Sequence, residues 1–119
     1  MKNFRKLIIW QKGIDLVIDI YKFSNDLPSD EKYGLISQIR RASVSIPSNI
    51  AEGSSRYSEK DFKRFLEIAI GSAFELETQL LIIQKLCLID KSKCDILIQS
   101  LQEEQKMINS LITKIKTNS

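Results

Sequence analysis

The spacing of apolar residues constrains this 119-residue chain more than any other feature. Along four long segments they recur every three or four positions, which places one apolar stripe on each of four α-helices. We expect helices near residues 9–25, 31–54, 58–87 and 92–116. Because the connections are short, sequential helices should be antiparallel. The pattern predicts an all-α protein, a single antiparallel up-and-down four-helix bundle.

The helix ends have recognisable signals. Pro28 separates the first two helices, since the residue before a proline is pushed out of the α region, and Ser29 or Asp30 can cap the second helix. Ser58 is placed to cap the third helix. Pro47 falls inside the second helix and predicts a kink there.

Small residues indicate how the second and third helices pair. Folding them back about the turn near Arg56 brings one set of small residues to the height of another: Ala42, Ser43 and Ser45 against Gly71, Ser72 and Ala73. Gly71 should cost about 1 kcal/mol relative to Ala in a helix interior. We therefore expect Gly71 to lie where the two backbones approach closely.

The residues needed for catalysis are scarce. The chain has no histidine, which removes the commonest general base and the commonest metal ligand. Its four glycines stand alone, so no phosphate-binding loop is present, and Cys87 and Cys94 are too few for a zinc site. We expect a protein that is not an enzyme and has no cofactor, metal or small-molecule substrate.

The same composition indicates where the protein works. No apolar run approaches the length of a membrane span or a signal-peptide core, so we expect a cytoplasmic protein without a membrane segment. Cys87 and Cys94 should then be reduced, and Cys87 should pack in the core.

Several polar residues are unusual for a simple bundle. They could form flanking salt bridges on the helix surfaces, or a polar network at a subunit interface or around a central pore. These candidates are Arg40, Arg41, Asn49, Glu52, Glu75 and Glu77.

Basic residues gather in two places, although the net charge is only +3. They could bind phosphates, or they could belong to solvated helix faces. The first cluster is Lys2, Arg5 and Lys6; the second is Arg56, Lys60, Lys63 and Arg64.

Long motifs in the second and third helices closely resemble a known family. Residues 31–35 read EKYGL, residues 38–53 read QIRRASVSIPSNIAEG, and residues 75–80 read ELETQL. The chain resembles the bacterial four-helix-bundle proteins encoded in intervening sequences of 23S ribosomal RNA genes. The likeness covers about residues 8 to 116.

The resemblance implies an antiparallel four-helix bundle that assembles as a homopentamer, and a relation in shape to the accessory protein of diversity-generating retroelements. It also implies RNA, or an RNA-handling protein such as a reverse transcriptase, as a partner. Two hypotheses follow. The first is an oligomer that binds RNA or such a partner, and the alternative is an oligomeric scaffold with no nucleic-acid role.

Apolar residues outside the four stripes also favour an oligomer. A single four-helix core should not hide all of them, and a large exposed apolar patch usually marks an interface. These residues are Ile8, Leu16, Phe23, Ile36, Ile70, Leu81 and Ile82.

Overall fold

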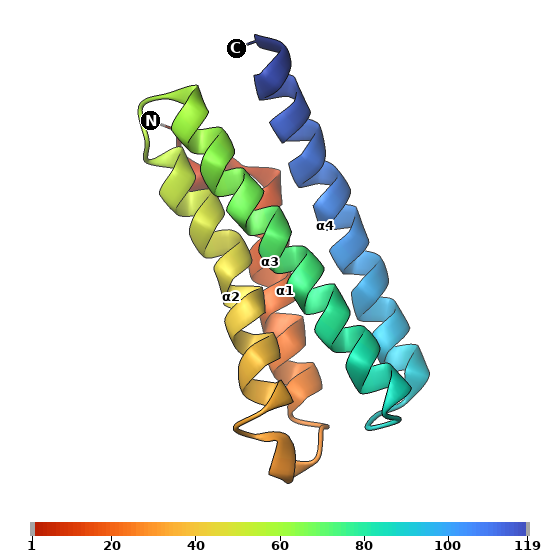
Figure 1. Cartoon of the computed structure of the whole chain (residues 1–119). Helices are drawn as coiled ribbons and strands as arrows, with labels where there is room; N and C mark the ends of the chain where they lie inside the picture. The colour runs from red at the N-terminus through yellow and green to blue at the C-terminus, as the bar shows by residue number, and fades with distance from the viewer. Residues whose placement is uncertain (1, 119) are drawn as a thin grey trace.

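The computed structural model describes residues 2–118, with side chains for residues 2–115. Within this range it contains four α-helices and no strand (Figure 1), so the predicted fold class is confirmed. The helices are α1 (Ile8–Ser24), α2 (Leu35–Ser54), α3 (Glu59–Lys85) and α4 (Lys91–Asn118). Two short 3-10 helices, η1 (Phe4–Lys6) and η2 (Ser29–Glu31), precede α1 and α2.

The helices form a closed ring of neighbours. Each helix packs antiparallel against the helix before it, and α4 also packs against α1. Among the described residues, the backbones of the diagonal pairs, α1 with α3 and α2 with α4, are not in contact. The resulting rod measures 45 × 21 × 20 Å. Within the described residues, no helix combines the length and apolar character needed to cross a bilayer.

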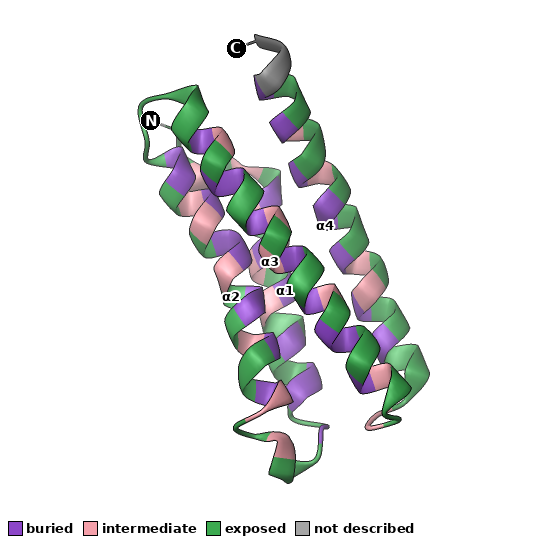
Figure 2. Cartoon of the chain, in the orientation of Figure 1, coloured by how far each residue is buried: buried purple, intermediate pink, exposed green. Residues whose placement is uncertain are grey.

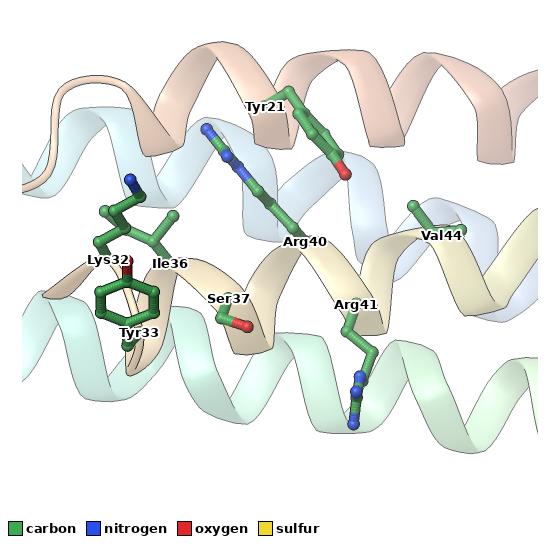
Figure 3. Close-up of a pocket in the computed structure, with 8 residues that line it drawn as sticks. All are labelled: Tyr21, Lys32, Tyr33, Ile36, Ser37, Arg40, Arg41 and Val44. Carbon is green, nitrogen blue, oxygen red and sulfur yellow. The ribbon is translucent and has the colours of Figure 1, made fainter.

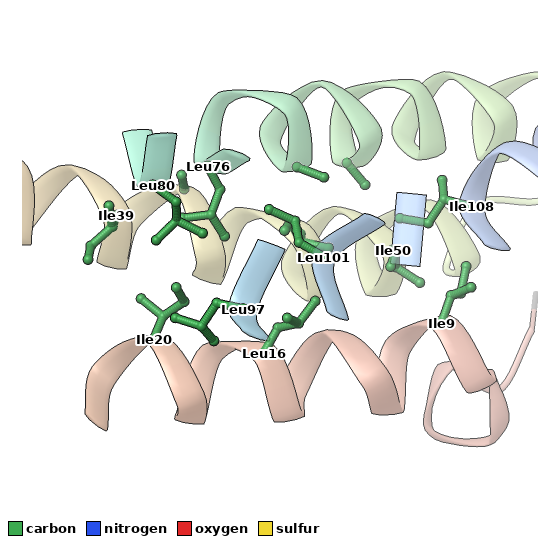
Figure 4. Packing of buried hydrophobic residues seen from close by; sticks show 14 of the residues in the cluster. Ile9, Leu16, Ile20, Ile39, Ile50, Leu76, Leu80, Leu97, Leu101 and Ile108 are labelled. Carbon is green, nitrogen blue, oxygen red and sulfur yellow. The ribbon is translucent and has the colours of Figure 1, made fainter. Parts of the chain in front are cut away.

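A single hydrophobic core runs along the axis of the rod. Figure 2 shows buried positions repeating along one side of each helix, as expected for amphipathic helices. Branched aliphatic side chains from all four helices interdigitate there (Figure 4). Those that are labelled include Ile20, Ile39, Leu76, Leu80, Leu101 and Ile108.

The helix starts agree only in part with the predictions. Ser58 caps α3 as expected, because its Oγ accepts a hydrogen bond from the backbone N–H of Asp61 at 3.1 Å. The second helix begins four residues later than predicted, at Leu35, with Gly34 as its N-cap. Residues 29–31 form η2 instead, and neither Ser29 nor Asp30 caps α2. α2 then continues without a break through the buried Pro47.

The predicted pairing of α2 with α3 is correct, but the residue at the close contact was wrongly assigned. The hydroxyls of Ser45 and Ser72 are hydrogen-bonded at 2.8 Å, which fixes the expected register. Gly71, however, is exposed, and a Cβ added there would meet nothing within 4 Å. The close approach is at Gly53, where an added Cβ would lie 2.6 Å from Phe65 Cβ.

The prediction that Cys87 packs in the core was also wrong. α3 ends at Lys85, and Cys87 lies in the following turn with φ of 57°, exposed to solvent. The turn is closed by a hydrogen bond from the Leu88 N–H to the Ile83 carbonyl at 3.3 Å. The helix therefore ends two residues before the position at which the heptad pattern would have buried the thiol, and Cys94 is the buried cysteine.

The extra apolar residues divide into two groups. Leu16, Phe23 and Ile36 are buried, so one bundle hides more of the set than expected. Ile8, Leu81 and Ile82 remain exposed, and Ile70 is half-buried.

The two glycines should respond oppositely to replacement by alanine. Gly53→Ala should lower the free energy of unfolding by about 1–3 kcal/mol, because the new methyl group overlaps Phe65. Gly71→Ala should raise it by up to about 1 kcal/mol, because alanine favours the helix and has free space. Urea denaturation of both variants would measure this. Equal midpoints would contradict the assignment of the close contact.

Candidate functional site

The two basic clusters of the sequence meet at one end of the bundle. The backbone N–H of Lys2 donates to the Ser54 carbonyl at 2.8 Å, which ties the N-terminal segment to the end of α2. The Lys2 ammonium contacts Glu59 Oε1 at 2.5 Å and lies 4.6 Å from the centre of the Phe62 ring. Figure 1 shows the start of the described chain near the turn between α2 and α3. We call this surface the basic end; it comprises Lys2, Arg5, Lys6, Arg56, Lys60, Lys63 and Arg64.

Most cations of the basic end have no acidic partner. Lys2 pairs with Glu59, and Arg56 lies 3.6 Å from Glu52. The other five form no ion pair with any described side chain. Their charge is therefore available to an external anion.

Aromatic residues organise the tip of the basic end. The guanidinium carbons of Arg56 and Arg64 lie 4.9 and 5.3 Å from the centre of the Phe65 ring, so both side chains are held by the same aromatic ring. Tyr57, between the two helices, is 88% exposed. A free aromatic face beside several cations can stack on an unpaired base.

The unusual polar residues do not form one network within the chain. Asn49 donates to the Ser45 carbonyl at 2.8 Å and so supports the Ser45 contact with α3. Glu77 accepts hydrogen bonds from Gln102 and Gln105 of α4, at 3.1 and 2.8 Å. These are separate local contacts between neighbouring helices.

The remaining polar candidates lie elsewhere. Glu52 belongs to the basic end through its pair with Arg56. Arg40 lies between α1 and α2 and contacts Tyr21, while Arg41 and Glu75 are exposed.

A buried carboxyl group in α4 was not predicted from the sequence. Glu104 is fully buried, and neither carboxyl oxygen has a hydrogen-bond partner among the described groups. It faces α1 and α2: a Cβ on Gly13 would lie 3.2 Å from Glu104 Oε2 and 3.3 Å from Pro47 Cβ. Burial raises the pKa of Glu104 to about 8, against a smaller lowering by Lys12. The carboxyl group is therefore protonated at neutral pH.

The sequence contained a signal for this residue. Glu104 follows Leu101 by three residues and precedes Ile108 by four, which places it on the buried stripe of α4. Gly13, the residue without a side chain on the facing helix, makes room for it.

The structure offers no metal-binding constellation among its described residues: no group of three or more Cys, Asp or Glu side chains could hold an ion. The elements that stand out are a basic end, a separate groove beside Arg40, and one buried neutral carboxyl group. These features describe a helical bundle with charged surfaces.

Comparison with known proteins assigns the family. Residues 5–110 match the family model described as 23S rRNA-intervening sequence protein, and the chain belongs to that family. A similar solved structure is described as a protein with unknown function from the S23 ribosomal protein family of Bacteroides thetaiotaomicron VPI-5482. It is 25% identical, with a TM-score of 0.82, over 88% of this chain and 98% of that one. Comparison with curated proteins gives no significant match.

Glu104 should make stability depend on pH. Its pKa lies above the ordinary 4.5, so between about pH 4.5 and 8 the folded state keeps a proton that the unfolded state has lost. The free energy of unfolding should fall as pH rises through this window, by up to about 1.4 kcal/mol per pH unit from this group. Glu104→Gln should flatten the profile, and Glu104→Leu should raise stability at pH 8.

Denaturation of each variant at several pH values measures this. Glu75→Gln is the matched control, because Glu75 is exposed and forms no ion pair with any described side chain. Parallel pH profiles for wild type and Glu104→Gln would show that the buried carboxyl group does not titrate in this range.

Proposed function

We propose that this protein acts by binding RNA at its basic end rather than by catalysis. One observation supports the proposal most strongly: two basic clusters some 50 residues apart in the sequence lie at the same end of the bundle, tied there by the contacts of Lys2 with Ser54 and Glu59. Phosphate contacts dominate the affinity of proteins for nucleic acid, and unpaired Lys and Arg side chains supply them. Exposed Tyr57 adds a stacking surface for an unpaired base.

The segregation of charge explains how a chain of modest net charge can bind RNA. Residues 65–90 of α3 and the following turn have Glu67, Glu75, Glu77 and Asp90 against Lys85 alone. At the basic end itself, seven cations outnumber the three carboxylates among them, Glu52, Glu59 and Asp61, so about four positive charges gather there, more than the net +3 of the whole chain.

We propose also that the protein forms a closed homo-oligomer, with five subunits favoured by the family resemblance stated above. A second line of exposed apolar side chains follows α3 at near-heptad spacing: Ile68, Phe74, Leu81 and Ile82. Apolar residues at this spacing on a solvent-facing side of a helix favour contact with another helix. A ring would repeat the basic end around its axis, so that weak phosphate contacts act together.

The scaffold hypothesis is the second candidate. This hypothesis rests on the same exposed apolar residues of α3, which could bind a protein partner while RNA has no role. The two hypotheses differ in whether the basic end has a ligand.

RNA binding should be salt-dependent and largely independent of sequence. Retention of a single-stranded or structured RNA should weaken steeply between about 50 and 200 mM salt. The triple variant Lys60→Glu, Lys63→Glu and Arg64→Glu should bind RNA weakly. In a plot of the logarithm of the binding constant against the logarithm of the salt concentration, its slope should be shallower by about 0.7 to 0.9 for each phosphate that it no longer binds. Reversing Lys2, Arg5 and Lys6 is the parallel test, with a smaller effect expected near a chain end.

A matched control reverses Lys22, Lys85 and Lys93, which lie at the other end of the bundle. This control makes the same change in net charge but should leave RNA retention nearly unchanged. If the wild-type protein retains no RNA even at low salt, the RNA proposal fails and the scaffold hypothesis replaces it.

Light scattering should give a mass several times the 13.7 kDa of one chain, with five copies favoured. Phe74→Glu combined with Leu81→Glu should reduce it, because two charges would be buried in the subunit contact. Gln99→Glu, an exposed position of α4, is the control for added charge. A monomer mass for the wild-type protein at micromolar concentration would contradict the assembly.

A further inference from the structure

A basic groove lies between the C-terminal half of α1 and the start of α2, away from the basic end. It encloses about 520 Å³ and is lined by Tyr21, Lys32, Tyr33, Ile36, Arg40 and Arg41 among others (Figure 3). This volume falls within the usual range for small-ligand sites. Ser54, where α2 meets the basic end, is thirteen residues beyond Arg41, about 20 Å along the helix.

Arg40 is held in place before any ligand binds. Its guanidinium carbon lies 4.6 Å from the centre of the Tyr21 ring, and its Nε donates to Ser24 Oγ at 2.9 Å. A longer contact of 3.4 Å joins Nη2 to Asn25 Oδ1. Ser24 is itself fixed, because its hydroxyl donates to the Tyr21 carbonyl at 2.8 Å. A guanidinium has more N–H donors than these two bonds use, so donors remain for a ligand.

The groove has positive charge and no acid to neutralise it. Lys32, Arg40 and Arg41 form no ion pair with any described side chain. Figure 3 shows Arg40 reaching from α2 toward α1, with Lys32 on the same part of the groove, whereas Arg41 leaves α2 on the side of α3. Arg40 and Lys32 are therefore the pair best placed to bind one oxyanion, with Arg41 at the rim.

An aromatic surface accompanies these cations. Tyr33 is 89% exposed, and the Lys32 ammonium lies 5.6 Å from the centre of its ring. A large aromatic side chain left open to water beside an oxyanion site is suited to stacking on a flat ring of the same ligand.

We propose that this groove binds a nucleotide with a terminal phosphate, either free or at the end of an RNA strand. The phosphate is bound by Arg40 and Lys32, and the base stacks on Tyr33. A terminal phosphate has close to two negative charges near neutral pH, whereas a phosphodiester within a strand has one, so the two unpaired cations Arg40 and Lys32 favour the strand end. The site is separate from the basic end and does not depend on RNA binding there.

Calorimetric titration of the whole protein with adenosine 5′-monophosphate, adenosine and inorganic phosphate tests the proposal. The monophosphate should bind at least about tenfold more tightly than adenosine, since the nucleoside cannot form charge-assisted hydrogen bonds through a phosphate. Inorganic phosphate should also bind more weakly than the monophosphate, because it cannot stack. Equal affinity for the monophosphate and either fragment would overturn the proposal.

Single substitutions test which groove residues bind the phosphate and which residue stacks on the base. Lys32→Gln and Arg40→Gln should each weaken monophosphate binding about tenfold and leave the weak binding of adenosine unchanged. Tyr33→Ala should weaken monophosphate binding without changing that of inorganic phosphate. Lys32 and Tyr33 are exposed, so their variants remain informative if Arg40→Gln, which removes the contact with Tyr21, fails to fold. Lys22→Gln, an exposed lysine outside the groove, is the control, and an equal weakening there would overturn the assignment.

Oligonucleotides with a 5′-phosphate or a 5′-hydroxyl distinguish the two sources of the ligand. If the strand end is the ligand, the phosphorylated strand displaces the monophosphate and the hydroxyl strand does not. If the free nucleotide is the ligand, neither strand displaces it. Groove variants should retain salt-dependent RNA binding at the basic end, and the Lys60, Lys63 and Arg64 reversals should retain monophosphate binding, so each proposal can fail without the other.

Discussion

The contact of Gly53 with α3 determines the geometry on which the basic end depends. Because Gly53 has no side chain, the last turn of α2 lies against Phe62 and Phe65 at a distance that no larger residue allows. The chain can then reverse within residues 55–58 and begin α3 at once. At this end the Ser54 carbonyl accepts a hydrogen bond from the Lys2 N–H, which places Lys2 beside Glu59 and Phe62 of α3. A backbone contact thus brings two charged segments together.

Charge is distributed in this molecule by position along the rod. The first turns of α3 have unpaired cations, the remainder of its outer side has acidic and apolar residues, and the groove beside α1 has a second, smaller set of cations. Each set is separated from the others by at least part of a helix length, so each can bind a different anion or surface. Net charge alone would describe this chain as nearly neutral.

Periodicity in the sequence was enough to predict the four helices and the pairing of α2 with α3, because both depend on which face each residue occupies. It failed where a local turn determines the outcome. Cys87 has the spacing of a core residue, but the left-handed turn after Lys85 exposes it. Gly71 was assigned to a contact because glycine is costly in helices, although only the rotation of α3 decides which glycine meets α2.

The candidate sites could be predicted from the sequence less completely than the helices and their pairing. The two basic clusters were visible as runs of Lys and Arg, but their meeting depends on a hydrogen bond between backbone groups of Lys2 and Ser54 that no side-chain pattern encodes. The groove depends on Arg40 and Tyr21, which come from different helices. Glu104 has the spacing of the buried residues of α4, but it was missed because the buried stripe was predicted from apolar residues alone.

The meeting of α1 with α4 has a consequence for how the molecule opens. These helices come from opposite ends of the chain, as the pair between Lys12 and Glu103 illustrates, and their interface is the sparsest of the four. Bringing together segments that are far apart in the sequence has the largest loop-closure entropy cost, and α1 and α4 are such a pair. The cost is much smaller for α2 and α3, which are joined by a turn of four residues. Local unfolding should therefore begin with α4 leaving α1. That motion would expose Glu104 to water and let its carboxyl group ionise, so a rise in pH should favour the state in which α4 has separated from α1.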